Sequence, residues 1–151
     1  MITSAWKFGK DIEEITHIRA SVNDAWDEFD EKSIHLIIYN EGKPVGCGSI
    51  YFDSGCYNIS HLSVVPEMQR QYIGDLMIRL LMIKGFNMMA DKIAVNSPLN
   101  TKDFFEKYGF KSVENFEKSV KMEVTPQTLI MNSKCGHDCS NCVNKDSCAA
   151  K

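Results

Sequence analysis

The sequence predicts an α/β (α+β) protein with one mixed, mostly antiparallel sheet and helices on both of its faces. Two observations carry this prediction. Short apolar stretches with a period of two alternate with stretches of helical period, in the order β-α-α-β-β-β-α-β-α-β-β. Three of the strands follow one another across glycine-containing turns, a pattern typical of antiparallel hairpins. At 151 residues the chain is long enough to bury a core of its own.

The first half of the chain contains the hairpins. We expect a helix over residues 11–22, with apolar residues on one stripe and Asp11 as its N-cap. Trp26 and Phe29 are expected in a second, short helix. The strands of this half are expected over residues 2–8, 33–40, 45–52 and 57–65, with turns at 41–43 and 53–55 between the last three.

The second half begins with a helix and ends in a cysteine-rich tail. Its expected elements are a helix over 73–86, a strand over 92–96, a helix that begins near Asn100, and a closing hairpin over 111–114 and 118–124. Pro126 and a polar stretch then separate the body from the tail. We therefore divide the chain into a domain over residues 1–130 and a tail over residues 131–151.

The composition is that of an ordinary globular protein, with 44% apolar and 25% charged residues. A net charge of −3 argues against a nucleic acid or an anionic membrane as a partner, because both select basic surfaces. The first fifteen residues contain no apolar run that could act as a signal peptide or a membrane span. We expect a cytoplasmic protein that is a monomer or a homodimer.

The segment from His61 to Met82 is the most informative part of the sequence. A strand-forming stretch stops at Pro66, which cannot donate to a sheet ladder. A polar turn follows, and after it apolar residues recur at helical spacing from Ile73 onward. Such a strand, turn and helix direct the free amides of a helix N-terminus at a phosphate, and Gly74 would let the backbone approach the ligand.

This segment resembles motif A of the GNAT superfamily of acyl-CoA-dependent N-acetyltransferases, roughly L-x-V-x-P-x-x-(Q/R)-x-x-G-x-(G/A). Leu62, Val64, Pro66, Gln69 and Gly74 fall on its positions in register. A second segment, NTKDFFEKYGF over residues 100–110, resembles the family's N-x-x-A-x-x-F-Y-E-K-x-G-F block. The resemblance covers residues 1–124.

The resemblance implies the GNAT fold and transfer of an acetyl group from acetyl-CoA to a primary amine by direct attack on the thioester. The acceptor is open between a small amine and a protein amine. Tyr72 replaces the first glycine of the family's phosphate loop, and Phe105 replaces the tyrosine that protonates the leaving thiolate in many relatives. The residues implied to bind acetyl-CoA are Leu62, Ser63, Val64, Gln69, Arg70, Gln71, Tyr72, Ile73, Gly74, Asp75, Asn100, Phe104 and Tyr108.

Amine acetylation needs a base, and His61 is our candidate because histidine titrates near neutral pH. A histidine that only hydrogen-bonds within the sheet is the alternative reading. His35, the next candidate, is expected to point outward. Tyr108 is the nearest phenol that could replace the acid missing at Phe105. A different class of function also fits the sequence, a catalytically weak acyl-CoA-binding or metal-responsive regulatory module.

The six cysteines fall into two groups. Cys47 and Cys56 lie in the body, too far apart along a predicted hairpin to form a disulfide. The tail has four more in the spacing C-x₃-C-x₂-C-x₅-C, which suits a tetrahedral Zn²⁺ site. The same thiolates could hold a [4Fe–4S] cluster, and a metal-free or oxidised tail is the third possibility. The predicted metal ligands are Cys135, Cys139, Cys142 and Cys148.

Overall fold

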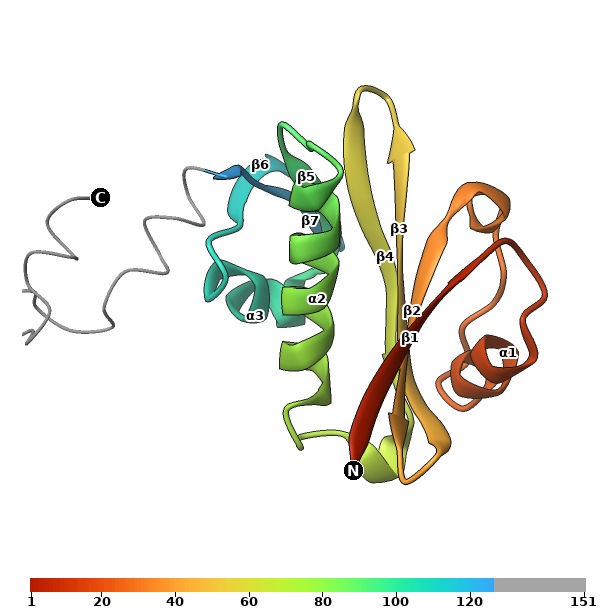
Figure 1. Cartoon of the computed structure of the whole chain (residues 1–151). Coiled ribbons are helices and arrows are strands. Elements are labelled where there is room, and N and C mark those ends of the chain that lie inside the picture. Colours follow the sequence, from red (N-terminus) through yellow and green to blue (C-terminus); the bar gives the residue numbers. More distant parts are fainter. Residues whose placement is uncertain (127–151) are drawn as a thin grey trace, which may run out of the picture. The chain divides into compact units, whose positions relative to one another are not determined.

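The computed structural model describes residues 1–126, and the four cysteines of the tail, Cys135, Cys139, Cys142 and Cys148, lie outside the described residues. The predicted fold class is confirmed as a mixed, mostly antiparallel sheet flanked by helices, with strand order β1-β2-β3-β4-β5-β7-β6 (Figure 1). The strands are β1 (Ile2–Phe8), β2 (Ile34–Asn40), β3 (Lys43–Asp53), β4 (Cys56–Val64), β5 (Ile93–Pro98), β6 (Lys111–Asn115) and β7 (Ser119–Val124). The helices are α1 (Glu13–Ala20), α2 (Ile73–Asn87) and α3 (Lys102–Glu106), with 3₁₀ turns η1 (Asp30–Lys32), η2 (Pro66–Met68) and η3 (Leu99–Thr101).

The chain divides into two compact units, Met1–Val95 and a second that begins at Asn96. In the first unit β1 to β4 form an antiparallel meander, and α2 connects β4 to the parallel strand β5. Both predicted hairpin turns are confirmed. Glu41 and Gly42 have φ of 51° and 80°, and Ser54 and Gly55 have φ of 53° and 83°. Two successive left-handed residues match the right-handed twist of the strands that they join.

Helices α1 and α2 cover opposite faces of the first unit's sheet (Figure 1). Glycines on β3 let α2 pack closely. A Cβ added at Gly46 would lie 3.0 Å from Ile73 Cγ2, and one at Gly48 would lie 2.9 Å from Leu81 Cδ1. The buried face of α2 consists of Ile73, Met77, Ile78, Leu81, Met82 and Gly85. The start of α2 is therefore fixed against β3, directly after the polar turn.

In the second unit α3 is followed by the predicted hairpin of β6 and β7. Strand β7 alternates between partly and fully buried residues, as expected for one apolar face. The rings of Phe105 and Phe110 are both buried, with their centroids 5.6 Å apart. These aromatic rings anchor α3 on its own unit.

The predicted helix around Trp26 and Phe29 is wrong. Residues 24–29 are an irregular segment, and only η1 follows it. Aspartate side chains take the backbone amides that a helix would use: Asp24 Oδ1 accepts from Ala25 N, and Asp27 Oδ1 accepts from Phe29 N, each at 2.9 Å. Such local bonds compete with helix formation. Helix α1 is also shorter than predicted, and Ile12 rather than Asp11 is at its N-cap position.

A buried polar cluster lies between α1 and the sheet. Arg19 donates to both carboxylate oxygens of Asp30 at 2.9 Å, and it also donates to Ser49 Oγ on β3 at 3.1 Å. Arg19 and Asp30 are 1% and 0% exposed. Burial raises the pKa of the Asp30 carboxyl, but the hydrogen bonds from Arg19 outweigh burial and hold this pKa below its ordinary value. The pair therefore remains ionised inside the unit.

The expectation that His35 points outward is wrong. Its ring is fully buried, with Nδ1 at 2.6 Å from Ser49 Oγ and Nε2 at 2.7 Å from the Gly9 carbonyl. Burial lowers the pKa of His35, so the ring is neutral at neutral pH. With both ring nitrogens bonded, His35 is a structural residue of the Arg19 cluster.

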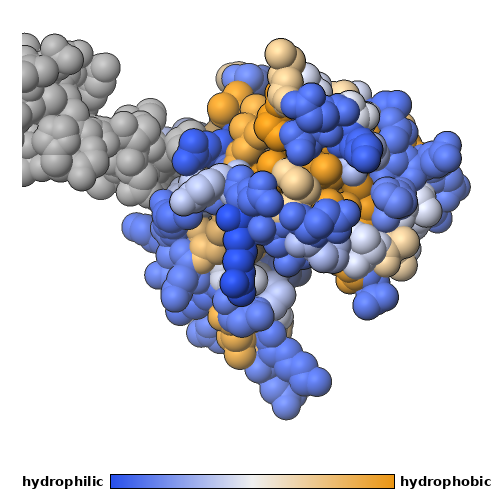
Figure 2. Space-filling model, turned by 90° about the horizontal axis from the view of Figure 1, so that it is seen from below, coloured by the Kyte–Doolittle hydropathy of each residue, from blue (hydrophilic) through white to orange (hydrophobic). Residues whose placement is uncertain are grey.

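No helix within residues 1–126 is long and apolar enough to cross a membrane. The face that Figure 2 shows is largely hydrophilic, with smaller apolar areas between the polar side chains.

The Arg19–Asp30 pair gives a stability prediction. Asp30→Ala should lower the free energy of unfolding by about 3–5 kcal/mol, because it leaves a buried guanidinium without its counter-ion. Urea unfolding at pH 7 measures this loss. The stabilisation by Asp30 is present above the ordinary carboxyl pKa and is lost as the pH falls through the lowered pKa of Asp30.

Asp53→Ala is the matched control, because Asp53 pairs with Lys32 at 3.0 Å on the surface. An exposed pair is screened by water, so this variant should lose far less stability. Equal losses in the two variants would contradict a special role for the buried pair.

Candidate active site

Side-chain hydrogen bonds cross the polar turn between β4 and α2. The side-chain amide of Gln69 donates to the Val64 carbonyl at 3.0 Å, and that of Gln71 donates to the Glu67 carbonyl at 3.3 Å. No side chain caps α2, and its first intrahelical bond runs from Leu76 N to the Tyr72 carbonyl at 3.1 Å. The earlier amides of a helix have no acceptor within the helix, and they carry its positive dipole end. The turn therefore offers an anion-binding geometry.

Two non-glycine residues of this turn have left-handed backbones. Arg70 has φ of 63° and Tyr72, at the N-cap position of α2, has φ of 65°. An L-residue with a side chain adopts this conformation at a cost of about 1–2 kcal/mol. Tyr72 thus takes the backbone shape that a glycine would supply, and its side chain is 80% exposed. It extends into solvent instead of filling the turn.

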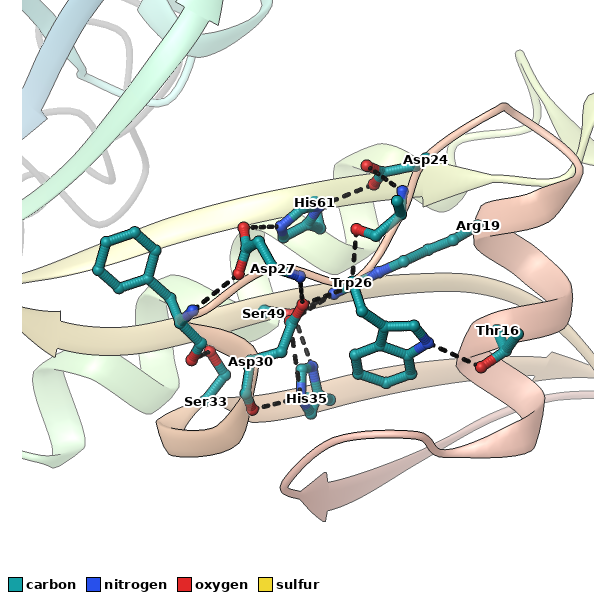
Figure 3. A network of polar contacts seen from close by, with 12 residues as sticks. Thr16, Arg19, Asp24, Trp26, Asp27, Asp30, Ser33, His35, Ser49 and His61 are labelled. Carbon is teal, nitrogen blue, oxygen red and sulfur yellow. Dashed lines mark hydrogen bonds and ion pairs between the residues drawn. The ribbon is translucent and has the colours of Figure 1, made fainter.

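His61 lies on an irregularity of β4. From Cys47 to Ser49 strand β3 advances two residues, while the paired stretch of β4, from Ser63 to Ser60, advances three. The extra residue is a β-bulge, and His61 has φ of 55° there. Bulges redirect side chains, and this one turns the imidazole toward the segment that follows α1 (Figure 3).

Two carboxylates hold the imidazole, one at each nitrogen (Figure 3). His61 Nδ1 lies 2.8 Å from Asp24 Oδ2, and Nε2 lies 2.5 Å from Asp27 Oδ2. The His61 side chain is 14% exposed, against 29% for Asp24 and 39% for Asp27. A ring between two acceptors donates from both nitrogens in its protonated form. The cluster can therefore hold and move a proton at a partly open position.

The buried Arg19 cluster fixes the segment that carries these aspartates. Asp30 Oδ2 accepts from the Asp27 amide at 2.7 Å, and Arg19 Nη1 donates to the Ala25 carbonyl at 3.5 Å. The guanidinium of Arg19 also lies 4.6 Å from the centre of the Trp26 ring, whose Nε1 donates to Thr16 Oγ1 at 2.8 Å. Residues 24–29 are thus held both by contacts with α1 and by the ion pair of Arg19 and Asp30.

Asp27, Asp30 and His61 present possible metal-ligand atoms within 4.8 Å of one another. Both carboxylate oxygens of Asp30 are already bonded to Arg19. A cation would have to replace the guanidinium, so we assign this group to hydrogen bonding and not to metal binding.

The two cysteines of the body form no disulfide, as the sequence predicted, and both are buried. Burial raises the pKa of the Cys47 thiol to about 12. A thiol that stays protonated is a poor nucleophile, which leaves Cys47 a packing role.

The remaining predicted site residues lie in the first turn of α2 (Ile73, Gly74 and Asp75), along β4 and in the second unit. Leu62, Ser63 and Val64 follow the bulge, and Ser63 Oγ lies 3.4 Å from Asp24 Oδ2. Asn100 is exposed in η3, and the rings of Phe104 and Tyr108 are 5.5 Å apart at α3. Phe105, at the position that the resemblance gives to a catalytic tyrosine, packs on Phe110 in that unit.

Sequence reasoning missed Asp24 and Asp27. The sequence feature that could have revealed them is the repeat of aspartates at positions 24, 27 and 30. Such a repeat also fits the polar face of a short helix. The contacts with His61 join residues 37 and 34 positions apart in the chain, so only the folded structure reveals them.

The comparisons with known proteins agree with this fold. A family model described as "Acetyltransferase (GNAT) domain" matches residues 9–128. The uncharacterized N-acetyltransferase YjcF of Bacillus subtilis is 22% identical over 91 residues, which are 60% of this chain and 65% of that protein. The match thus spans slightly less than two thirds of this relative.

Solved structures show the same fold at low identity. An acyl-CoA N-acyltransferase from Pseudomonas aeruginosa superposes with a TM-score of 0.71 at 14% identity, covering 82% of this chain and 99% of that chain. A GNAT family acetyltransferase from Elizabethkingia anophelis, solved with acetyl-CoA bound, superposes with a TM-score of 0.69 at 15% identity. That superposition covers 82% of this chain and 97% of the other.

Proposed function

The chain belongs to the GNAT acetyltransferase family, and from this premise we propose that it transfers an acetyl group from acetyl-CoA to a primary amine by direct attack. The observation that carries the proposal is the hydrogen-bonded turn before α2, whose N-terminal amides have no side-chain cap. The residues of this turn are the ones that match the family motif. Amides from about Arg70 to Asp75 would hold the pyrophosphate. The side-chain amides of Gln69 and Gln71 brace the turn from within.

The part of β4 that is not paired with β5 supports the placement of the pantetheine arm. The parallel register of β4 with β5 covers Tyr57 to Ile59 and stops before the bulge at His61. Backbone groups of Leu62 and Val64 would then bond the arm in the manner of an added strand. The arm would lead the thioester from the phosphate turn toward His61. The resemblance to the family motif is the support for proposing Asn100, Phe104 and Tyr108 as further acetyl-CoA-binding residues.

The resemblance implies direct attack, and it is consistent with this that the thiol of Cys47, with its raised pKa and full burial, is unsuited to attack a thioester. His61 is proposed as the base that takes the proton of the amine. His61 lies on β4, the same strand whose Leu62 and Val64 would bind the arm, so the proton acceptor and the thioester would come together. Tyr108 is proposed as the phenol that could assist the leaving sulfur.

Acetyl-CoA should raise the melting temperature, because a ligand that binds only the native state stabilises it. Gly74→Val should remove most of this shift, since a β-branched side chain obstructs the approach of the backbone to the ligand. Differential scanning fluorimetry measures the shift. Gly74→Ala should have an intermediate effect. An undiminished shift in Gly74→Val would contradict the phosphate site.

Thiol release from acetyl-CoA with a panel of primary amines tests the reaction. His61→Ala should lower turnover at least about tenfold at pH 7, because base catalysis contributes about 10²–10⁴ in rate. The acetyl-CoA shift of the variant should stay intact. His17→Ala, an exposed histidine on α1, is the control and should keep full turnover. Acetyl-CoA binding without turnover in the unmodified protein would favour the alternative, a catalytically weak acyl-CoA-binding module.

We further propose that residues 131–151 form a separate metal-binding tail, in which Cys135, Cys139, Cys142 and Cys148 hold about one Zn²⁺ or one iron–sulfur cluster per chain. The support is their sequence spacing alone. Elemental analysis and a visible spectrum of anaerobically purified protein should give near-stoichiometric zinc and no colour. Iron, sulfide and absorption near about 400 nm would indicate a cluster instead.

Cys139→Ser combined with Cys142→Ser should abolish either metal and spare acetyl-CoA binding, because the phosphate turn belongs to the other part of the chain. Loss of acetyl-CoA binding in this double variant would contradict the division of the chain near residue 130.

A further inference from the structure

The two carboxylates that flank His61 differ in their surroundings, and we propose that they divide the work of the reaction. Asp24 positions the imidazole, and Asp27 binds the acceptor amine as its ammonium cation before His61 takes the proton. This inference rests on the proposed function, in which His61 is the base. It extends that function to a class of acceptor, amines that carry a positive charge at neutral pH.

Asp24 is held on three sides. Its Oδ2 accepts from His61 Nδ1 at 2.8 Å and from Ser63 Oγ at 3.4 Å, and its Oδ1 accepts from the Ala25 amide at 2.9 Å. Ser63 is 5% exposed and belongs to β4, two residues after His61. Asp24 thus fixes the ring relative to the strand that carries it. A carboxylate on Nδ1 keeps the proton there and directs Nε2 toward the reaction.

Asp27 is the more accessible partner. Its side chain is 39% exposed, against 29% for Asp24 and 14% for His61. Its backbone is nevertheless fixed, because its amide donates to Asp30 Oδ2 at 2.7 Å. Its Oδ1 accepts from the Phe29 amide, and its Oδ2 faces His61 Nε2. Asp27 therefore has a fixed backbone and a carboxylate that an incoming cation can reach.

The charges explain why an ammonium belongs beside Asp27. With a proton on both nitrogens the imidazole carries one positive charge between two carboxylates, but it has no lone pair to accept a proton. Loss of the Nε2 proton creates the base and leaves two carboxylates facing a neutral ring. The next charged group, Asp30, is neutralised by Arg19. An ammonium bonded to Asp27 Oδ2 replaces the lost positive charge.

The reaction then balances. An N–H bond of the ammonium breaks and an Nε2–H bond forms, so the positive charge moves to the imidazolium between the same two carboxylates. The free amine attacks the thioester carbonyl carbon, the C–N bond forms, and the C–S bond breaks with its electron pair on sulfur. The second amine proton ends on that sulfur, which leaves as the thiol of CoA.

Two isosteric variants separate the roles when kcat and KM are measured for the best alkylamine of the panel at saturating acetyl-CoA. Asp27→Asn should raise KM about tenfold or more and change kcat less than about threefold, because it removes a charge-assisted hydrogen bond made in the bound complex. Asp24→Asn should lower kcat at least about tenfold with KM nearly unchanged, because the amide does not hold the right tautomer. Asp27→Glu should restore part of the affinity.

Asp91→Asn, an exposed aspartate before β5, is the control and should leave both constants unchanged. Equal changes in kcat and KM for the two variants, or an unchanged KM in Asp27→Asn, would overturn the division of roles while the acetyltransfer itself stands. Transfer by the unmodified protein to none of the alkylamines would overturn the proposed function and this inference with it.

Discussion

The first unit depends most on the buried ion pair between Arg19 and Asp30. Both side chains are removed from water, and that cost is offset only because their hydrogen bonds are almost all satisfied. The guanidinium binds both Asp30 oxygens and Ser49, and Asp30 also takes the amide of Asp27. One pair thereby joins α1, the irregular segment 24–29 and β3. Without it the segment would lose the bond from the Asp27 amide to Asp30 and the bond from Arg19 to the Ala25 carbonyl.

Several left-handed backbones lie in the region of the proposed site. His61, Arg70 and Tyr72 have positive φ within twelve residues, at the bulge and at the turn before α2. Each such residue costs on the order of 1–3 kcal/mol and persists only where its surroundings determine it. The close packing of α2 on Gly46 and Gly48 provides that support at one end. Backbone strain, an anion-binding turn and the proposed base thus share one connection of the fold.

The sequence predicted what depends on neighbouring residues and failed where distant ones decide. The turns at Gly42 and Gly55 and the period of α2 are local, and the structure confirms them. His35 could not be oriented because β2 is buried on both faces, so alternation carries no signal. The proposed helix at Trp26 failed because Asp24 and Asp27 bond nearby amides. Their contacts with His61 are long-range, beyond any local pattern.

The number of protons that the amine loses in the proposed reaction also bears on the missing tyrosine at Phe105. This ring packs on Phe110 and has no proton to give. In the proposed reaction the amine brings two protons to lose, one for His61 and one for the leaving sulfur. A thiol has an ordinary pKa near about 8.5, so its thiolate leaves at neutral pH without a strong acid. A well-positioned base is therefore the stricter requirement of the proposed reaction, and in the structure both ring nitrogens of His61 face an aspartate.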